Sequence, residues 1–370
     1  MMSQFKNIFA YSYFVMAALS ISLNAPAIAG ELALAQETVL PPLPVAVSNN
    51  AVAAVFTSQG SFIMSFAGLG SGKRHDDTHA STFVFDAGRQ AWKESAPVPG
   101  GDGRLASVAV AVDGFAYVFG GYTVASDGSE VSLPYAHSFD PLRETYSDLT
   151  PMPVPVDDAV AVTFEDRYIY LISGWHDFGN VNLVQRYDTV SDSWMQATPI
   201  PGPAVFGHAG GIVDNQIVYC DGVAVKANVD RRRDFAATNR CYVGLIDEED
   251  GRRIDWRSIP PHPGEPRYRM AAAGVGTGVL FIGGSANPYN FNGIGYNGEP
   301  SQPEPGALLY VPLSGSWHEL PIDGDATMDH RGLVKFDQQW LTLGGMLGNQ
   351  QVTNRVNSYR LDSAGQAAPP

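Results

Sequence analysis

Positive charge is scarce in this sequence. Its 23 lysines and arginines are outnumbered by 38 aspartates and glutamates, which gives a formal charge of −15 at pH 7. Proteins that bind nucleic acid need a basic stripe against the phosphates, and an anionic membrane surface repels an acidic protein. We therefore expect neither nucleic acid nor, once any leader is removed, a membrane as partner.

Long apolar runs are confined to the N-terminus. Lys6 precedes an apolar stretch over residues 8–23, and residues 27–29 form an Ala-Ile-Ala cleavage site. This order is typical of an export signal, so we expect residues 1–29 to be removed and the mature protein to be periplasmic or secreted. The alternative is a retained membrane anchor, against which the polar residues late in the run argue.

Cysteine occurs only twice, at Cys220 and Cys241. The first ends one expected strand and the second begins its antiparallel neighbour, so their Cα atoms can lie within the roughly 4.4–6.8 Å that a disulfide requires. An exported protein with an even number of cysteines favours a bridge. Two buried free thiols are the alternative.

Glycine, by contrast, is abundant, with 39 residues, and it marks an internal repeat. Six apolar runs end in a glycine pair or its remnant, and the second glycines are 51, 53, 48, 62 and 61 residues apart. The six signals are Gly68-Leu69-Gly70, Gly120-Gly121, Ser173-Gly174, Asp221-Gly222, Gly283-Gly284 and Gly344-Gly345. Such a period suits one small antiparallel sheet per repeat, which is one blade of a propeller.

The other strands of each repeat carry their own marks. A first strand and a tight turn precede the glycine strand, and a third strand ends in an acid. An aromatic residue then follows, with a proline four or five residues later; the aromatics are Trp92, Tyr146, Trp194, Trp256 and Trp317. The sixth repeat lacks this outer strand, and residues 37–40 at the other end of the chain match it. We therefore predict an all-β, six-bladed propeller over residues 30–364, closed by an N-terminal strand, with a disordered tail at 365–370.

These features together resemble the Kelch motif, and several stretches narrow the resemblance. They are Val39-Leu40-Pro41, Gly68-Leu69-Gly70-Ser71, and Pro99-Gly100-Gly101 followed by Arg104 and Tyr117-Val118-Phe119-Gly120-Gly121. They are similar to the periplasmic six-bladed Kelch mutarotases that interconvert the anomers of N-acetylneuraminic acid. The resemblance covers residues 39–361 and implies the same fold.

In each blade, the long loop between the second and third strands and the segment that leads into the first strand, its entry, lie on the same face of the propeller. We therefore expect the functional site on that face. The entries supply a ring of polar residues, including Arg104, Asp158, His208, Arg267, Arg269, His330 and Arg331. Several arginines in an acidic protein predict a receptor for a carboxylate or sulfate. Alternatively, these residues pair with one another and merely seal the ring.

The loop of the fourth repeat is rich in arginine, with Arg231, Arg232 and Arg233 in sequence. The resemblance implies a glutamate just after the glycine and an arginine some residues later, but Val223 stands where the glutamate is expected. Opening a pyranose ring needs a base and an acid. His208, Asp221 and Asp234 are the candidates for that catalytic role.

A further loop, residues 288–297, interleaves aromatics with amides and begins with Pro288-Tyr289. Together with Trp175 and Tyr122 it predicts a platform on which a sugar stacks, although ordinary packing is the alternative.

The run His75-Asp76-Asp77-Thr78-His79 holds possible metal ligands, but ligands so close in sequence rarely complete a site. We therefore expect a solvated loop, no metal and no cofactor.

Three functions are compatible with this sequence. We expect a carbohydrate-interacting propeller that acts as mutarotase on an anionic sugar such as N-acetylneuraminate. The alternatives are a non-catalytic binding or interaction module, and a polysaccharide lyase in which an arginine neutralises a uronate while His208 or a tyrosine removes the α-proton. In each case the expected partner is a small anionic sugar or an oligosaccharide.

Overall fold

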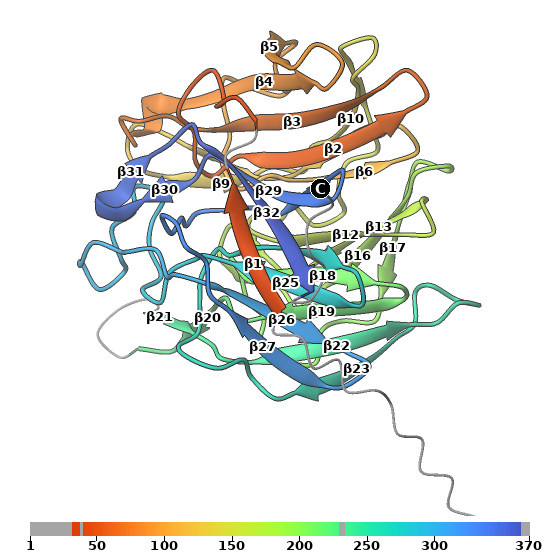
Figure 1. Cartoon of the computed structure of the whole chain (residues 1–370), viewed down its shortest axis with the longest axis vertical. Helices are drawn as coiled ribbons and strands as arrows, with labels where there is room; N and C mark the ends of the chain where they lie inside the picture. The colour runs from red at the N-terminus through yellow and green to blue at the C-terminus, as the bar shows by residue number, and fades with distance from the viewer. Residues whose placement is uncertain (1–31, 38–39, 229–233, 364–370) are drawn as a thin grey trace, which may run out of the picture.

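The computed structural model describes residues 32–37, 40–228 and 234–363. Within them the chain forms strands and two short 3-10 turns, η1 (His75–Asp77) and η2 (Gly348–Gln350). The strands make six four-stranded antiparallel sheets and four two-stranded hairpins. The prediction of an all-β, six-bladed propeller is confirmed (Figure 1).

In blades 1 to 5 the strands follow sequence order from the channel outward, and in blade 6 the outermost strand is the N-terminal β1 (Leu32–Glu37). Blade 1 is β2 (Ala51–Thr57), β3 (Gly60–Leu69), β4 (Thr78–Asp86) and β5 (Ala91–Ser95). Blade 2 is β6 (Val108–Val112), β7 (Phe115–Phe119), β10 (Ala136–Asp140) and β11 (Thr145–Asp148). Blade 3 is β12 (Val160–Phe164), β13 (Tyr168–Ile172), β16 (Val184–Asp188) and β17 (Ser193–Ala197).

The second half of the ring repeats this order. Blade 4 is β18 (Ala209–Val213), β19 (Gln216–Cys220), β22 (Cys241–Ile246) and β23 (Ile254–Ile259). Blade 5 is β24 (Ala271–Val275), β25 (Gly278–Ile282), β26 (Ala307–Val311) and β27 (Ser316–Leu320). Blade 6 is β28 (Val334–Phe336), β29 (Gln339–Leu343), β32 (Val356–Ser363) and β1 (Leu32–Glu37).

The N-terminal strand closes the ring. β1 pairs antiparallel with β32 from Leu32↔Ser363 to Glu37↔Ser358, and Leu34 packs into the core that blades 5 and 6 share. Closure by an N-terminal strand is therefore confirmed, but the predicted bounds were wrong: the strand ends at Glu37, and the proline-rich segment that resembled a strand end follows it as a loop.

The repeated acid and the repeated aromatic both have structural causes. Asp86 Oδ1 accepts hydrogen bonds from the backbone N–H groups of Gly88 (2.9 Å) and Arg89 (3.2 Å), which caps the turn between third and fourth strands. Asp140, Asp188 and Asp247 do the same in blades 2, 3 and 4. The tryptophan of an outer strand donates its indole N–H to a carbonyl near the proline that follows the previous blade. The four pairs are Trp92 with Pro41, Trp194 with Thr150, Trp256 with Thr198 and Trp317 with Pro260.

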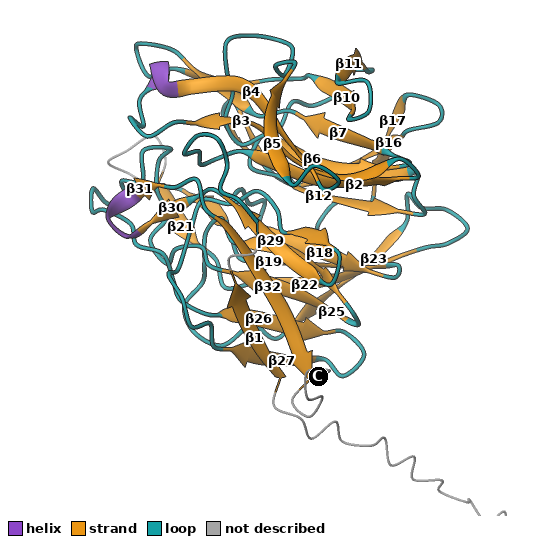
Figure 2. Cartoon of the chain, turned by 45° about the horizontal axis from the view of Figure 1, so that its top comes forward, coloured by secondary structure: helices purple, strands orange, loops and turns teal. Residues whose placement is uncertain are grey.

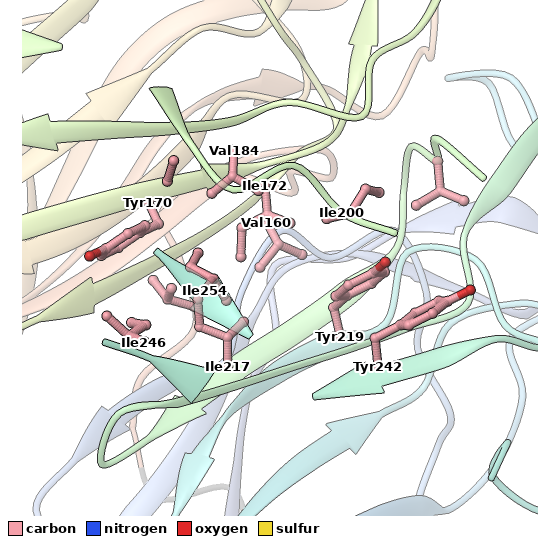
Figure 3. Close-up of a cluster of buried hydrophobic side chains, with 13 residues drawn as sticks. Val160, Tyr170, Ile172, Val184, Ile200, Ile217, Tyr219, Tyr242, Ile246 and Ile254 are labelled. Carbon is pink, nitrogen blue, oxygen red and sulfur yellow. The ribbon is translucent and has the colours of Figure 1, made fainter. Parts of the chain in front are cut away.

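Apolar layers between neighbouring blades form the core. Between blades 3 and 4, Ile172 and Val184 face Ile217 and Ile254 (Figure 3). Comparable clusters lie between the other blades. Burying a side chain of this size contributes about 1.5–3 kcal/mol, so the layers fix each blade against the next and hold the channel residues in place.

Four hairpins extend the second and third strands beyond the blades, all at one end of the channel. They are β8–β9 (Tyr122–Val124, Glu130–Ser132), β14–β15 (Trp175–His176, Gly179–Asn180), β20–β21 (Val223–Lys226, Asp234–Ala237) and β30–β31 (Met346–Leu347, Gln351–Val352). Figure 2 shows η1 and η2 on the side where β21, β30 and β31 lie. We call this side the long-loop face and the opposite side, with its tight turns, the short-turn face.

Candidate functional site

A closed belt of backbone hydrogen bonds surrounds the long-loop end of the channel. One residue of each blade, two or more positions before its first strand, has a left-handed φ between 49° and 70°: Asn49, Ala106, Asp158, Gly207, Arg269 and Asp329. Around the belt, each blade donates an N–H group to a carbonyl of the preceding blade over 2.8–3.4 Å. The belt fixes the direction of the five side chains at these positions, since Gly207 has none.

Two arginines and two aspartates fill the centre of this belt. Arg269 contacts Asp158 at 2.5 Å and Asp329 at 3.0 Å, and Arg331 contacts the same carboxylates at 2.9 Å and 3.5 Å. Asn49 adds hydrogen bonds to both Asp329 and Arg331. All four charged side chains are at most 3% exposed. We call these four residues the charge plug.

The charge plug is neutral overall, because two guanidinium groups face two carboxylates. Burial opposes ionisation of Asp158, but Arg269 and Arg331 outweigh it and lower the pKa of that carboxyl. The pKa of Arg269 lies well above its usual value, since its carboxylate neighbours outweigh the cost of burial. Every charge here is already compensated, so the plug offers no spare cation to a carboxylate ligand.

A mostly apolar layer covers the plug on its long-loop side. It consists of six antiparallel residue pairs, one per blade: Ser48↔Leu69, Leu105↔Tyr122, Asp157↔Trp175, Phe206↔Val223, Tyr268↔Ser285 and Met328↔Met346. Tyr289 also belongs to this cluster and, with Tyr268, lies against the Arg269 guanidinium at 5.3 Å and 4.6 Å. We call the six pairs the cap layer. It separates the plug from solvent.

Half-buried aromatic rings extend the cap layer towards the surface of the long-loop face. Trp175 lies 5.3 Å from Phe206 and 5.8 Å from Phe235, measured between ring centroids. Phe235 in turn stacks on Tyr296 at 4.3 Å. Trp175, Phe235 and Tyr296, which we call the aromatic surface, come from blades 3, 4 and 5 and are each partly exposed. Flat, partly exposed rings of this kind suit the apolar face of a sugar.

The other end of the channel is open. A cavity of about 280 Å³ runs along the first strands of all six blades, from Asp158 and Arg331 at the plug to Phe56 and Lys335 at the short-turn face. Phe56 is 50% exposed. The walls of this cavity are mainly alanine, glycine and valine. Among the described strands, the channel edge of each first strand has no strand partner. Exposed acids occupy the turns around the mouth: Asp113, Glu165, Asp166, Asp214 and Asp337.

Arg104 and Arg267 were expected in the ring but lie outside the belt, at equivalent positions of blades 2 and 5. The Arg104 guanidinium donates to the carbonyls of Pro99 and Gly120, and that of Arg267 donates to Gly283, Pro305 and Gly306. Burial lowers the pKa of Arg104 to about 10. Both side chains bind backbone of their own region, whereas Arg269 and Arg331 form the plug.

His208 and His330 also share one repeat position, and both point between blades. His208 packs edge-on against Tyr219 at 5.6 Å, and its ring faces the backbone of Ile172 in blade 3. His330 Nε2 bonds Thr327 Oγ1 at 2.9 Å. Burial lowers the pKa of each histidine to about 4, so both are neutral at pH 7. Neither is placed to exchange protons with a ligand on the long-loop face.

Of the other two catalytic candidates, one is buried in hydrogen bonds within the protein and the other points away from the aromatic surface. Asp221 is 1% exposed and accepts hydrogen bonds at Oδ2 from the Arg267 backbone (2.7 Å) and from His262 Nε2 (2.6 Å). Asp234 pairs with Lys226 in β20–β21, next to Phe235 in sequence. Because neighbouring strand residues alternate in direction, Asp234 points away from the hairpin face that carries Phe235.

The predicted disulfide is present. Cys220 and Cys241 are opposite each other in β19 and β22, with their Cα atoms 4.1 Å apart and their sulfurs bonded. Arg231, Arg232 and Arg233, which we expected to bind substrate, lie outside the described residues. So do the predicted signal at 1–29 and the tail at 365–370. No helix among the described residues is long and apolar enough to cross a membrane.

The His75–His79 run forms η1 and the start of β4. Asp76 pairs with Arg74, and Asp77 accepts the Arg74 backbone N–H. Across the described ranges, no three His, Cys, Asp or Glu side chains come together as metal ligands.

Sequence reasoning missed Asp329, which completes the plug, and Phe235, which completes the aromatic surface. Asp329 directly precedes His330 and Arg331, but it lies five positions before β28, whereas the other belt residues lie two positions before their first strands, so a constant offset does not find it. Phe235 had no comparable signal, because its contact with Tyr296 joins loops of two blades.

Comparisons with known proteins agree with this architecture. No family model matches the chain. It is 27% identical over 112 residues to Kelch-like protein 15 of Danio rerio and 26% identical over 189 residues to Kelch-like protein terF of Aspergillus terreus. These matches span 30% and 50% of this chain, but only 18% and 38% of the two relatives.

A longer match covers most of the propeller. An N-acetylneuraminate epimerase of Salmonella arizonae is 23% identical over 298 residues, which is 68% of this chain and 70% of that protein. The solved structure of YjhT superposes with a TM-score of 0.65 at 16% identity, covering 86% of this chain and 95% of the other. The chain is a six-bladed Kelch-type β-propeller, and its sequence resembles that of an N-acetylneuraminate epimerase.

Proposed function

We propose that this protein is an exported propeller that binds a small acidic sugar of the N-acetylneuraminate class on its long-loop face and interconverts the sugar's anomers. The observation that carries the proposal is the aromatic surface of Trp175, Phe235 and Tyr296, held partly exposed by three different blades. The similarity to an N-acetylneuraminate epimerase over 68% of the chain supports the choice of sugar.

The turns around the mouth of the open channel are acidic. Five exposed acids surround the short-turn mouth, where Lys335 is the exposed basic residue of the channel lining. An anionic sugar is repelled there. On the long-loop face, the exposed residue Arg240 belongs to the same excursion as Phe235 and supplies positive charge. The carboxylate of the ligand is therefore expected to face this excursion, not the compensated charge plug.

Export is part of the proposal. The chain begins with a sequence typical of a cleaved signal, and the Cys220–Cys241 disulfide suits an oxidising compartment. The mature protein is then periplasmic or secreted.

A second candidate is a non-catalytic binding module, and one observation favours it. His208 and Asp221 are buried in structural contacts, and Asp234 points away from the aromatic surface. None of the three residues first expected to move protons is placed to do so. A binding module needs the aromatic surface alone.

Two measurements separate these candidates. Calorimetric titration with N-acetylneuraminate and with its uncharged methyl ester should give binding to both, at least tenfold tighter for the acid, since a charge-assisted hydrogen bond is worth about 1.5–3 kcal/mol. NMR exchange spectroscopy should then show faster anomer exchange in the presence of the protein. Binding without faster exchange would leave the module, and no binding of the acid would contradict both candidates.

A further inference from the structure

The cap layer holds one ionisable carboxyl among twelve residues. Its other members are aliphatic, aromatic, methionine or serine side chains, apart from the very weakly acidic hydroxyls of Tyr122 and Tyr268. Asp157 is 3% exposed. A carboxyl placed in an apolar layer is costly unless it is neutral or paired, so its presence here needs a reason.

The contacts of Asp157 indicate which of its oxygens carries a proton. Ser132 Oγ lies 2.7 Å from Asp157 Oδ2, and the backbone N–H of Asp177 donates to the same serine oxygen over 3.2 Å. The serine hydroxyl accepts from Asp177 and is thereby free to donate its own hydrogen to Oδ2. Within the described chain no side chain or backbone group bonds Oδ1, which leaves that oxygen available for a proton.

Burial and the surrounding charges favour the protonated form of Asp157. Burial and then the adjacent Asp158 raise the pKa of Asp157 well above its usual value, and Glu130 acts in the same direction. Arg269 opposes this effect, but its guanidinium hydrogen bonds go to Asp158 and Asp329. These effects favour the neutral carboxylic acid, which has one donor and one acceptor oxygen on the same group.

Asp157 lies beside the aromatic surface. Its N–H and C=O groups bond those of Trp175 over 3.0 Å and 2.9 Å, so the two residues are directly opposite in an antiparallel bridge. Side chains at such positions leave the backbone on the same face, with Cβ atoms about 5 Å apart. A sugar stacked on Trp175 thus has Asp157 as its nearest carboxyl in the cap layer.

We propose that Asp157 is the proton-transfer residue for anomer exchange on this face, an inference that rests on the proposed function. Oδ1–H gives its proton to the ring oxygen of the sugar, and Oδ2 takes the proton of the anomeric hydroxyl. The bond between the anomeric carbon and the ring oxygen breaks, and a carbonyl forms at that carbon. Closure on the other face of the carbonyl reverses both transfers, so the carboxyl is regenerated without a cofactor or a second acid.

This assignment explains how a chain with Val223 in place of the expected glutamate can still move both protons. A neutral carboxyl acts as acid and base at once, and Ser132 holds its acceptor oxygen in place. The ligand class follows from the same chemistry: a reducing sugar whose anomeric hydroxyl and ring oxygen both reach one carboxyl.

Asp157→Asn tests the assignment, because an amide keeps the shape of the side chain and its bond to Ser132 but cannot shuttle a proton. We expect affinity for N-acetylneuraminate within twofold of wild type and an anomer-exchange rate at least 100-fold lower, the usual scale for a lost general acid or base. Asp127→Asn, at the exposed tip of the β8–β9 hairpin, is the matched control and should exchange at the wild-type rate.

The outcomes are distinct. Normal exchange by a folded, ligand-binding Asp157→Asn overturns the role of Asp157 and leaves the proposed function standing, whereas absence of sugar binding by wild type overturns the proposed function itself. If Asp157→Asn does not fold, Ser132→Ala and the pH profile of the wild-type rate decide. The inference requires slower exchange in that variant and a wild-type rate that falls as rising pH ionises the carboxyl. A flat profile contradicts it.

Discussion

The two ends of the central channel differ in burial, charge and composition. At the long-loop end, the belt, the charge plug and the cap layer leave Arg269 and Asp329 at most 3% exposed. At the short-turn end, a cavity of about 280 Å³ reaches the surface beside Phe56, among exposed acids. The same six first strands line both ends of the channel: each begins next to the belt and ends at a tight turn on the short-turn face.

The difference shows that an open cavity and a ligand site need not coincide. Six first strands cannot pair across the axis, so a channel is a consequence of the fold. The long-loop end, in contrast, requires specific residues from every blade, including compensated charges whose desolvation is costly. Such construction gives a rigid base for the aromatic surface and for Asp157.

The largest expected effect comes from breaking the charge plug. Arg269→Met leaves two buried carboxylates with one guanidinium, and we expect the free energy of unfolding to fall by about 3–5 kcal/mol. Chemical denaturation measures it. Arg257→Met is the matched control, because Arg257 pairs with Asp255 at the surface, where both side chains are more than 60% exposed. Such a pair is worth about 0–1 kcal/mol. Equal losses in the two variants would contradict the contrast between a sealed interior and the surface.

The next effect concerns the disulfide at the base of the long-loop excursion in blade 4. Replacing both Cys220 and Cys241 by alanine should lower the free energy of unfolding by about 3 kcal/mol, the chain-entropy value for a loop of this length. Thiol titration of the denatured, unreduced wild-type protein should find no free thiol. Two titratable thiols would show that the bridge does not form.

The sequence was sufficient for the fold because the repeat leaves periodic marks with local causes. Glycine pairs, the turn-capping aspartates and the tryptophans that donate to the previous blade recur at similar spacing, and each marks one strand. The closing strand was located less well. Residues 37–40 matched the strand-and-proline pattern, but the register of β1 depends on pairing with β32 at the far end of the chain.

The site was only partly predictable. The entries to the first strands were identified, including Asp158, Arg269 and Arg331, and their mutual pairing was one of the two alternatives, but the sequence did not decide between pairing and ligand binding. Arginines close together in the sequence also have different partners. Arg267 and Arg269 are two residues apart, yet one binds backbone carbonyls and the other fills the plug. The partner of each arginine depends on how all six blades are arranged, and no local sequence pattern predicts it.

A smaller, pH-dependent effect should appear at the edge of the long-loop end. His262 Nδ1 lies 2.7 Å from the Pro263 carbonyl, which can only accept, and Nε2 lies 2.6 Å from Asp221. Although burial opposes the charge, these bonds raise the pKa of His262 above its usual value. The stabilisation is therefore fully present below the unfolded pKa of about 6.5 and is lost as pH rises through the folded pKa.

We expect this loss to amount to about 1.5 kcal/mol, the lower value for a hydrogen bond to a charged group. Denaturation of wild type and His262→Gln across the range from pH 5 to 9 measures it, with His318→Gln on the exterior of blade 5 as control. Identical pH dependence of wild type and His262→Gln would show that the pair does not titrate in this range.

The most direct test of the contrast between the two ends compares ligand affinity after changing one aromatic ring at each. Calorimetric titration with N-acetylneuraminate should show Trp175→Ala binding about tenfold more weakly than wild type, a loss of about 1.4 kcal/mol. Phe56→Ala, at the open mouth of the channel, should bind within twofold of wild type. The opposite result, with Phe56→Ala impaired and Trp175→Ala unchanged, would place the ligand in the channel and contradict the account.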